Sequence, residues 1–190
     1  MRTIINDDQY LHYTINNFNK NEQGSYKEIL EPIDNLLKTM INKHNKVLFI
    51  RFDLTYPQYG NFSNNNELLS RFIETLTVYW KRKKIDPLYL WVREQATSDN
   101  HHYHFMLLLN GNLIQNPFRV FEKAEELWGR CLGVVGKGLV HKGIDLMIRR
   151  NTPEFEQQRQ DCFKHASYLA KVYSKGSAPP GVRGMGMSNL

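Results

Sequence analysis

Two strand-like segments lie so close together in the sequence that they can pair only as an antiparallel hairpin. Residues 87–95, PLYLWVREQ, and residues 102–110, HYHFMLLLN, are both rich in aromatic and aliphatic side chains. Residues 96–101, ATSDNH, form a polar connection between them. A parallel crossover needs about a dozen residues or more, so this connection is too short for one. The sheet that contains both segments is therefore at least partly antiparallel.

Helices and further strands alternate along the rest of the chain. Apolar residues at helical spacing, with capping residues before them, predict helices over residues 25–43, 66–84, 116–128 and 152–175. Thr152 as cap and Pro153 at the first helical position are expected to begin the last of these helices. A buried strand is expected over residues 47–57, and one or two short strands over residues 139–148. This order of elements predicts an α+β fold.

Length and composition fit a single globular domain. The chain has 190 residues, of which 41% are hydrophobic and 23% charged, so a fibrous repeat and a disulfide scaffold are excluded. No run approaches the roughly 18 apolar residues of a membrane-spanning helix. The N-terminus is polar where a signal peptide has an apolar core, so we expect a cytoplasmic protein without membrane association. Cys131 and Cys162 are then expected to be reduced thiols.

Positive charge is concentrated in the C-terminal third. The formal net charge is +6, and no acidic residue follows Asp161. Lysine and arginine side chains gathered in this way can hold a phosphate backbone. The residues expected to contact DNA are Lys142, Arg149, Arg150, Lys164, Lys175 and Arg183.

His102 and His104 are candidate metal ligands. Two positions apart on a strand, their imidazoles point to the same face, whereas His101 points to the other. If the hairpin pairs Glu94 opposite His102, the carboxylate joins them, with paired Cβ atoms about 5 Å apart. Two imidazole nitrogens and one carboxylate suit a divalent cation that acts as a Lewis acid. The alternative is that both histidines are ordinary surface or core residues.

Tyr168 is the candidate nucleophile. Helical phase places it on the side of Lys164, Lys171 and Lys175, and a phenol that attacks a phosphate needs nearby positive charge. The opposite side of the helix carries an apolar stripe of Phe155, Arg159, Cys162, Ala166, Leu169 and Tyr173. If Tyr168 meets the sheet, this stripe must pack elsewhere, for example on the first helix. The alternative is an ordinary surface tyrosine ringed by lysines.

Three segments resemble, in order, the motifs of the HUH endonucleases that initiate rolling-circle replication. They are FIRFDLTYP at residues 49–57, HYHFMLLLNG at residues 102–111 and YLAK at residues 168–171. SYLAKVYSK and the later RGMGMS are also similar to replication proteins of filamentous phages and their prophage relatives of the inovirus Gp2 type. The resemblance implies a sheet of about five antiparallel strands flanked by helices, with RRM-like topology.

The same resemblance implies site-specific nicking and joining of single-stranded DNA at the replication origin of a phage or mobile element. Glu94, His102 and His104 would bind Mg²⁺ or Mn²⁺, Tyr168 would form a 5′-phosphotyrosine, and Lys171 would assist. Tyr173 lies about 140° from Tyr168 on a helix, so a paired nucleophile is not expected. No GxxxxGK[ST] motif is present, so strand separation is expected from a host helicase.

We divide the chain into an N-terminal helical segment packed on the domain, residues 1–45, a nickase domain, residues 46–176, and a flexible basic tail, residues 177–190. The tail is rich in glycine and proline and is expected to be mobile until DNA is present. Two alternatives remain open for the function. One is a catalytically idle module that binds an origin or operator, and the other is a relaxase or transposase with the same chemistry.

The charge distribution predicts that single-stranded DNA binds even when divalent metal is chelated, with an affinity that falls steeply as salt rises. Fluorescence anisotropy of a labelled oligonucleotide over a salt series measures this dependence. Joint neutralisation of Lys142, Arg149 and Arg150 is predicted to weaken binding. A salt-independent affinity, or an affinity unaffected by this substitution, would contradict the role given to the basic residues.

Overall fold

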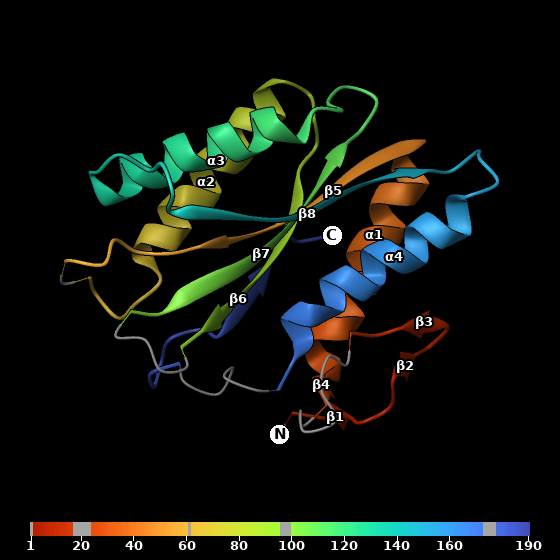
Figure 1. Cartoon of the computed structure of the whole chain (residues 1–190), viewed down its shortest axis with the longest axis horizontal. Helices are drawn as coiled ribbons and strands as arrows, with labels where there is room; N and C mark the ends of the chain where they lie inside the picture. Colours follow the sequence, from red (N-terminus) through yellow and green to blue (C-terminus); the bar gives the residue numbers. More distant parts are fainter. Residues whose placement is uncertain (1, 17–23, 61, 96–99, 173–177) are drawn as a thin grey trace.

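A five-stranded antiparallel sheet with helices on both faces forms the body of the computed structural model, which describes residues 2–16, 24–60, 62–95, 100–172 and 178–190 (Figure 1). The strands are β5 (Lys46–Leu54), β6 (Leu88–Glu94), β7 (His102–Asn110), β8 (Val140–Arg149) and β9 (Met185–Met187). The helices are α1 (Lys27–Lys43), α2 (Glu67–Arg82), α3 (Pro117–Leu132) and α4 (Phe155–Ser167), and the 3₁₀ turn η1 (Tyr168–Ala170) follows α4. The predicted α+β fold is confirmed.

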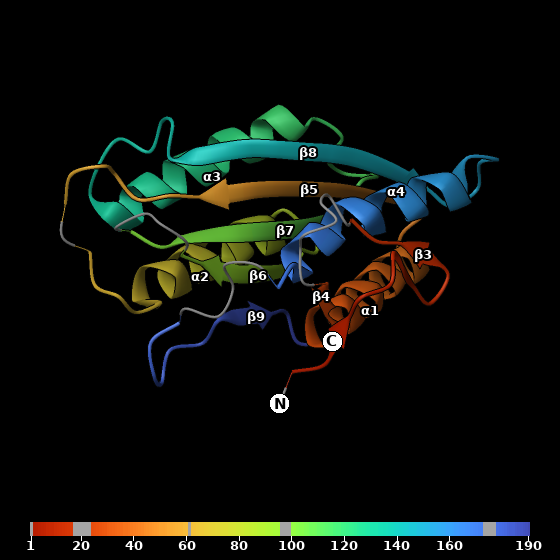
Figure 2. The ribbon, with the colours of Figure 1, turned by 60° about the horizontal axis from the view of Figure 1, so that its bottom comes forward.

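The order of the strands is that of a βαββαβ unit. Along the chain the elements run β5, α2, β6, β7, α3 and β8, and across the sheet the order is β8, β5, β7, β6, with β9 beside β6 (Figure 2). The first and third strands of the unit, β5 and β7, are therefore central. This order confirms the expected RRM-like topology, and β6 and β7 form the hairpin that the short connection requires.

β7 separates two apolar cores. Its residues Tyr103, Phe105 and Leu107 pack with α2 and α3, whereas Met106 and Leu108 pack with α1 and α4. All five side chains are at most 1% exposed. A strand that is covered on both faces carries apolar residues continuously instead of alternating them with polar ones, which explains the run FMLLL in the sequence.

The N-terminal residues belong to the second core. Tyr13 stacks on Phe163 of α4 with ring centroids 3.9 Å apart, and its hydroxyl donates to Asp34 of α1 over 3.1 Å. Burial and the charge of Asp34 raise the pKa of Tyr13 well above its ordinary value, so this hydroxyl remains a donor. Four two-residue strands precede α1, paired as β1 (Ile4–Ile5) with β4 (Ser25–Tyr26) and β2 (Gln9–Tyr10) with β3 (Tyr13–Thr14).

Three of the helices begin within two residues of the predicted start, but α3 extends past the predicted end at Trp128 to Leu132. Asn66 and Asn116 occupy the N-cap positions of α2 and α3 as expected. The Asn116 side chain accepts a hydrogen bond from the amide of Phe118, whereas the Asn66 side chain makes no cap hydrogen bond. The prediction that Thr152 and Pro153 begin the last helix is wrong, because the Thr152 hydroxyl donates to the carbonyl of Arg149 and the helix begins at Phe155. None of the helices in the described part of the chain is long and apolar enough to span a membrane.

The last helix also ends earlier than predicted, and Tyr168 lies in the 3₁₀ turn beyond it. The chain leaves the helical path because it pairs with the segment before α1. Val172 donates to the carbonyl of Gly24 over 3.1 Å, and Lys171 forms a bridge with Ser25. Residues 173–177, which include Tyr173 and Lys175, lie outside the described part of the chain.

The C-terminal residues differ from the expected flexible tail, because β9 is the fifth strand of the sheet. Gly186 pairs with Trp91 of β6, and beyond β9 the amide and hydroxyl of Ser188 form hydrogen bonds with the backbone of Tyr89. Ser188 is itself buried. The segment from Gly184 to Ser188 therefore closes the edge of the sheet that β6 would otherwise expose.

Gly186 provides a test of whether β9 is part of the sheet in solution. A Cβ atom at this position would lie 2.7 Å from Nε1 of Trp91, whose ring is buried. We predict that Gly186→Ala lowers the free energy of unfolding by about 1–3 kcal/mol through overpacking, as measured by urea denaturation. Met187→Ala is the control, because its side chain is 41% exposed and should contribute less than about 0.5 kcal/mol. Equal stability of Gly186→Ala and the unmodified protein would support a detached tail instead.

Candidate metal centre and nucleophile

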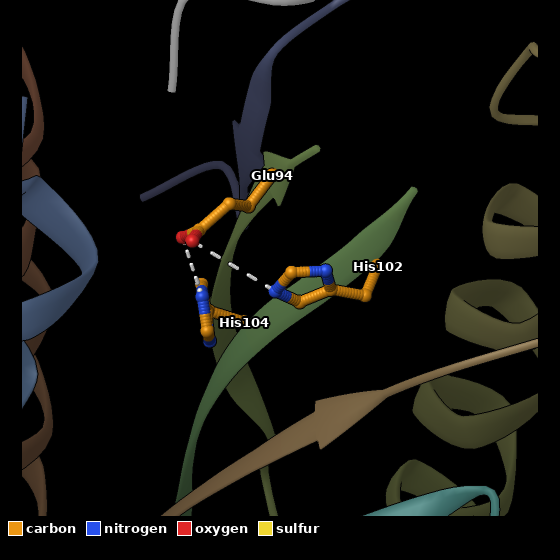
Figure 3. Close-up of side chains that lie close together, drawn as sticks. All are labelled: Glu94, His102 and His104. Atoms are coloured by element: carbon orange, nitrogen blue, oxygen red, sulfur yellow. Dashed lines mark hydrogen bonds and ion pairs between the residues drawn. The ribbon is translucent and has the colours of Figure 1, made fainter. Parts of the chain in front are cut away.

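The candidate metal ligands lie together at one end of β6 and β7. Glu94 pairs directly with His102, which confirms the predicted register of the hairpin. The pleat then places Glu94, His102 and His104 on one face, and Figure 3 shows the carboxylate directed toward both imidazoles. One ligand atom from each residue lies within 4.8 Å of the others. The predicted convergence of the three side chains is confirmed.

This donor set fits a divalent cation. One oxygen of Glu94 lies 2.6 Å from Nε2 of His104, and the other lies 4.0 Å from Nε2 of His102. Two atoms that each bind the same ion at about 2.0–2.2 Å lie up to about 4 Å apart, so small side-chain rotations bring all three onto a shared ion. Two imidazoles and one carboxylate also leave coordination positions for water or substrate.

Asp53 is the member of the site that sequence reasoning missed. It lies on β5 directly opposite His104, and its Oδ1 is 2.6 Å from Nδ1 of that histidine. With the histidine proton on Nδ1, this contact is a hydrogen bond donated to Asp53, and Nε2 is left to bind a metal. FIRFDLTYP contains the aspartate, but its partner depends on the register between β5 and β7, for which the sequence carries no local signal.

The surroundings of Asp53 favour its ionised form. Burial raises the pKa of the carboxyl, whereas the hydrogen bond with His104 and the positive charge of Arg51 lower it. Together, the effects that lower the pKa outweigh the effect of burial, so the pKa of Asp53 lies below its ordinary value. An ionised carboxylate is the stronger acceptor and orients the imidazole that would bind the metal.

Tyr168 lies directly against the ligand group. Its ring is nearly perpendicular to the ring of His104, with centroids 5.3 Å apart. Cζ of Arg51 lies 4.4 Å from the centre of the Tyr168 ring, and Nζ of Lys171 lies 4.8 Å from it. Helical phase alone left open whether Tyr168 faces the sheet, and the structure brings it there.

The apolar stripe of α4 packs on α1, as it must if Tyr168 is to face the sheet. Cys162 and Ala166 lie in one core with Leu36 and Leu37 of α1 and are fully buried. Burial raises the pKa of the Cys162 thiol far above its ordinary value, so this cysteine is an inert core residue. Packing of the stripe on α1 leaves the other side of the α4 terminus and η1 free to carry Tyr168 toward His104.

A buried polar network lies behind the ligands, on the opposite face of the sheet. His101 Nε2 lies 3.1 Å from the Tyr56 hydroxyl and 2.9 Å from the Tyr103 hydroxyl. Tyr103 donates to Asn66, which also accepts from Arg93. Burial, followed by the charge of Arg93, lowers the pKa of His101 to about 4, so the ring is neutral at pH 7. Residues that alternate with the three ligands along β6 and β7 are thus fixed by hydrogen bonds.

Two of the basic residues expected to contact DNA lie far apart on β8. Lys142 is exposed, and its ammonium lies 4.7 Å from the centre of the Phe118 ring. Arg149 is also exposed but pairs with Lys46 at the other end of the strand, roughly 23 Å away at the rise of an extended chain. The remaining candidates are Lys164, exposed on α4, Arg183, exposed before β9, and Lys175, which lies outside the described residues.

Arg150 is engaged with the C-terminus of α1. Its guanidinium donates to the carbonyls of Ile41 and Asn42, over 3.1 and 3.2 Å, and to the side chain of Asn45. The last carbonyls of a helix have no partner within the helix, so these bonds stabilise its end. A substitution of Arg150 would therefore change stability together with charge, and Lys142 and Arg149 are the clearer positions for a test of DNA binding.

Removal of the Asp53 carboxylate tests its role in the site. We predict that Asp53→Ala weakens the binding of Mn²⁺ by about 10–100-fold, because His104 loses the acceptor that fixes its orientation and proton. Isothermal titration calorimetry with Mn²⁺ measures this affinity. Asp145→Ala removes an exposed carboxylate from β8 and should leave the affinity unchanged. Equal affinities of the two variants would exclude an orienting role for Asp53.

The chain has recognisable relatives. It matches the YagK/YfjJ C-terminal domain family over residues 9–188. It is also 26% identical, over 192 residues, to the uncharacterized protein YagK of Escherichia coli (strain K12), in an alignment that covers 82% of this chain and 92% of that protein. No solved structure matches the chain at a significant level. Because the family match includes every strand of the sheet, every ligand candidate and Tyr168, the protein belongs to the YagK/YfjJ C-terminal domain family.

Proposed function

We propose that this protein is a metal-dependent HUH endonuclease that nicks and rejoins single-stranded DNA through Tyr168. The observation that carries the proposal is the contact between Tyr168 and His104, because it places a phenol beside a group able to bind a divalent cation. The motif resemblance supports it independently. Residues from FIRFDLTYP, HYHFMLLLNG and YLAK, far apart in the sequence, meet at one end of the sheet through Asp53, His104 and Tyr168.

A Mg²⁺ or Mn²⁺ ion held by Glu94, His102 and His104 would supply Lewis acidity at an oxygen of the scissile phosphate. Tyr168 is the nucleophile. Its phenol oxygen forms a bond to phosphorus as the bond from phosphorus to the 3′ oxygen breaks. The phenol loses its proton and the 3′ oxygen gains one, which leaves a 5′-phosphotyrosine and a free 3′-hydroxyl. Attack by another 3′-hydroxyl reverses the reaction, and ATP is not needed because the phosphotyrosine keeps the energy of the cleaved linkage.

Lys171 assists this reaction through its charge. Its ammonium lies 4.8 Å from the centre of the Tyr168 ring, beside the proposed nucleophile. A fixed cation in that position stabilises the transition state more than the ground state. Its removal should slow the reaction without abolishing it, because the lysine forms no bond to the substrate.

The substrate that fits this chemistry is a single-stranded replication origin of a phage or other mobile element in the cytoplasm of a prokaryotic cell. Cleavage there would leave a 3′-hydroxyl from which a host polymerase can begin rolling-circle synthesis. Strand separation is assigned to a host helicase, since the chain has no GxxxxGK[ST] motif. A relaxase or transposase would use the same residues on a different DNA.

Tyr168→Phe tests the proposal directly. The substitution removes one oxygen and keeps the ring, so the fold and the affinity for Mn²⁺ should remain while covalent attachment to DNA disappears. The measurement is a gel in which a labelled pool of single-stranded oligonucleotides, incubated with the protein and Mn²⁺, shifts the protein band. Lys171→Ala should form the same adduct more slowly, and His102→Ala should form none.

Tyr59→Phe is the matched control, because this tyrosine is 86% exposed on a loop and should react like the unmodified protein. An adduct formed by Tyr168→Phe would mean that another residue is the nucleophile, with Tyr173 the next candidate. If the unmodified protein forms no adduct with any divalent metal but still binds single-stranded DNA, a non-catalytic origin-binding or operator-binding module replaces the proposed enzyme.

A further inference from the structure

Arg51 occupies an unusual position for an arginine in a sheet. It lies on β5, two residues before Asp53 and therefore on the same face. Its guanidinium carbon is 4.4 Å from the centre of the Tyr168 ring. The side chain is half-buried, and its Nε is buried without a hydrogen-bond partner. In the described part of the chain, Arg51 belongs to none of the ion pairs.

The backbone around Arg51 is shaped to admit this side chain. The register between β5 and β8 shifts between Ile50 and Phe52, so Arg51 has no direct partner on β8. Gly143 lies across from it, where a Cβ atom would be 2.7 Å from the carbonyl oxygen of Arg51 and 3.2 Å from its Nε. The extra residue of this bulge lies on β8, whereas Arg51 pairs regularly with Met106 of β7. Bulges occur often beside active sites. The absence of a side chain at Gly143 leaves room for the Arg51 side chain, which lies beside Tyr168.

A stabilising role accounts poorly for this arrangement. The charge of Arg51 acts on Asp53 of the same strand, but the guanidinium forms no direct ion pair with that carboxylate. Its stacking on Tyr168 is opposed by the burial of an unpaired N–H group. An anion beside Tyr168 would bring a negative charge to the terminal nitrogens of the Arg51 guanidinium. The planar guanidinium fits two oxygens of a phosphate at once, which an ammonium such as that of Lys171 does not.

We propose that Arg51 is a further catalytic residue, which binds the non-bridging oxygens of the scissile phosphodiester while Tyr168 attacks it. This inference rests on the proposed function. As the bond from the phenol oxygen to phosphorus forms and the bond to the 3′ oxygen breaks, negative charge gathers on the non-bridging oxygens. Arg51 and Lys171 lie close to the Tyr168 ring and stabilise that charge together, Arg51 with directed hydrogen bonds and Lys171 as a point charge.

The first measurement compares single-turnover rates of adduct formation on one single-stranded oligonucleotide with Mn²⁺. We expect Arg51→Gln to react about 100–1,000-fold more slowly, as when one stabilising donor is removed from an active site. Arg51→Lys should recover part of the rate, because it restores the charge without the paired N–H groups. Arg82→Gln removes an exposed arginine from α2, on the other face of the sheet, and should react at the unmodified rate.

The second measurement distinguishes contact with the phosphate from an effect on Tyr168 itself. The scissile phosphate is replaced by a methylphosphonate, in which one charged oxygen becomes a neutral methyl group. If Arg51 binds that charge, the ratio of the unmodified rate to the Arg51→Gln rate should shrink toward one, as in a double-mutant cycle. A ratio unchanged on the methylphosphonate would show that Arg51 acts on the tyrosine and would overturn the inference.

The outcomes also separate this inference from the function on which it rests. If the unmodified protein forms no adduct, the proposed function fails, and the role of Arg51 fails with it. If the unmodified protein forms the adduct and Arg51→Gln forms it equally fast, only the role of Arg51 is wrong. Calorimetry with Mn²⁺ completes the comparison, because a variant that binds the metal normally but reacts slowly has kept the ligand site intact.

Discussion

The register of β7 between its two neighbours decides whether this protein has a site at all. Asp53 of β5 lies opposite His104, and Glu94 of β6 lies opposite His102, so both carboxylates reach the same face. Because side chains alternate along a strand, a shift of one residue in either pairing would turn a carboxylate into the apolar core on the other face. The buried run from Phe105 to Leu109, covered on both sides, fixes that register. The buried apolar residues of β7 thus hold its two histidines, His102 and His104, in position opposite the carboxylates.

The charges of the site are divided between its two sides. Asp53 and Glu94 approach His104 from opposite ring nitrogens, while Arg51 and Lys171 lie close to the Tyr168 ring. A phosphate that enters would be attracted by the two cations and repelled by the two carboxylates. A divalent ion among the ligands would cancel that repulsion. In the proposed reaction, the metal and Tyr168 would then act on the same phosphate.

The local part of this arrangement could be predicted from the sequence, and the non-local part could not. The short connection of residues 96–101 forces a hairpin, and its register brings Glu94 to His102. Asp53 reaches the site through pairing with a strand that follows it by some fifty residues, and no local pattern encodes that pairing. The contact of Arg51 with Tyr168 likewise joins β5 to η1, which lies far from it in the sequence. β9 escaped prediction because three residues with a glycine at the centre are too few to show a strand period.

The side chain of one asparagine, Asn66, links the C-terminal segment to the hairpin that carries the candidate ligands. Asn66 occupies the N-cap position of α2, but its side chain bonds elsewhere: the amide donates to the carbonyl of Arg183, and the oxygen accepts from Arg93 and Tyr103. It thus joins the C-terminal segment to the rear of the hairpin that carries Glu94 and His104. The family match continues to residue 188 and begins at residue 9, so it includes both β9 and the residues that complete the core beneath α4. In the described part of the chain, residues before 46 complete the core beneath α4 and β9 extends the sheet beside β6, so both ends of the chain support the strands that hold the ligands.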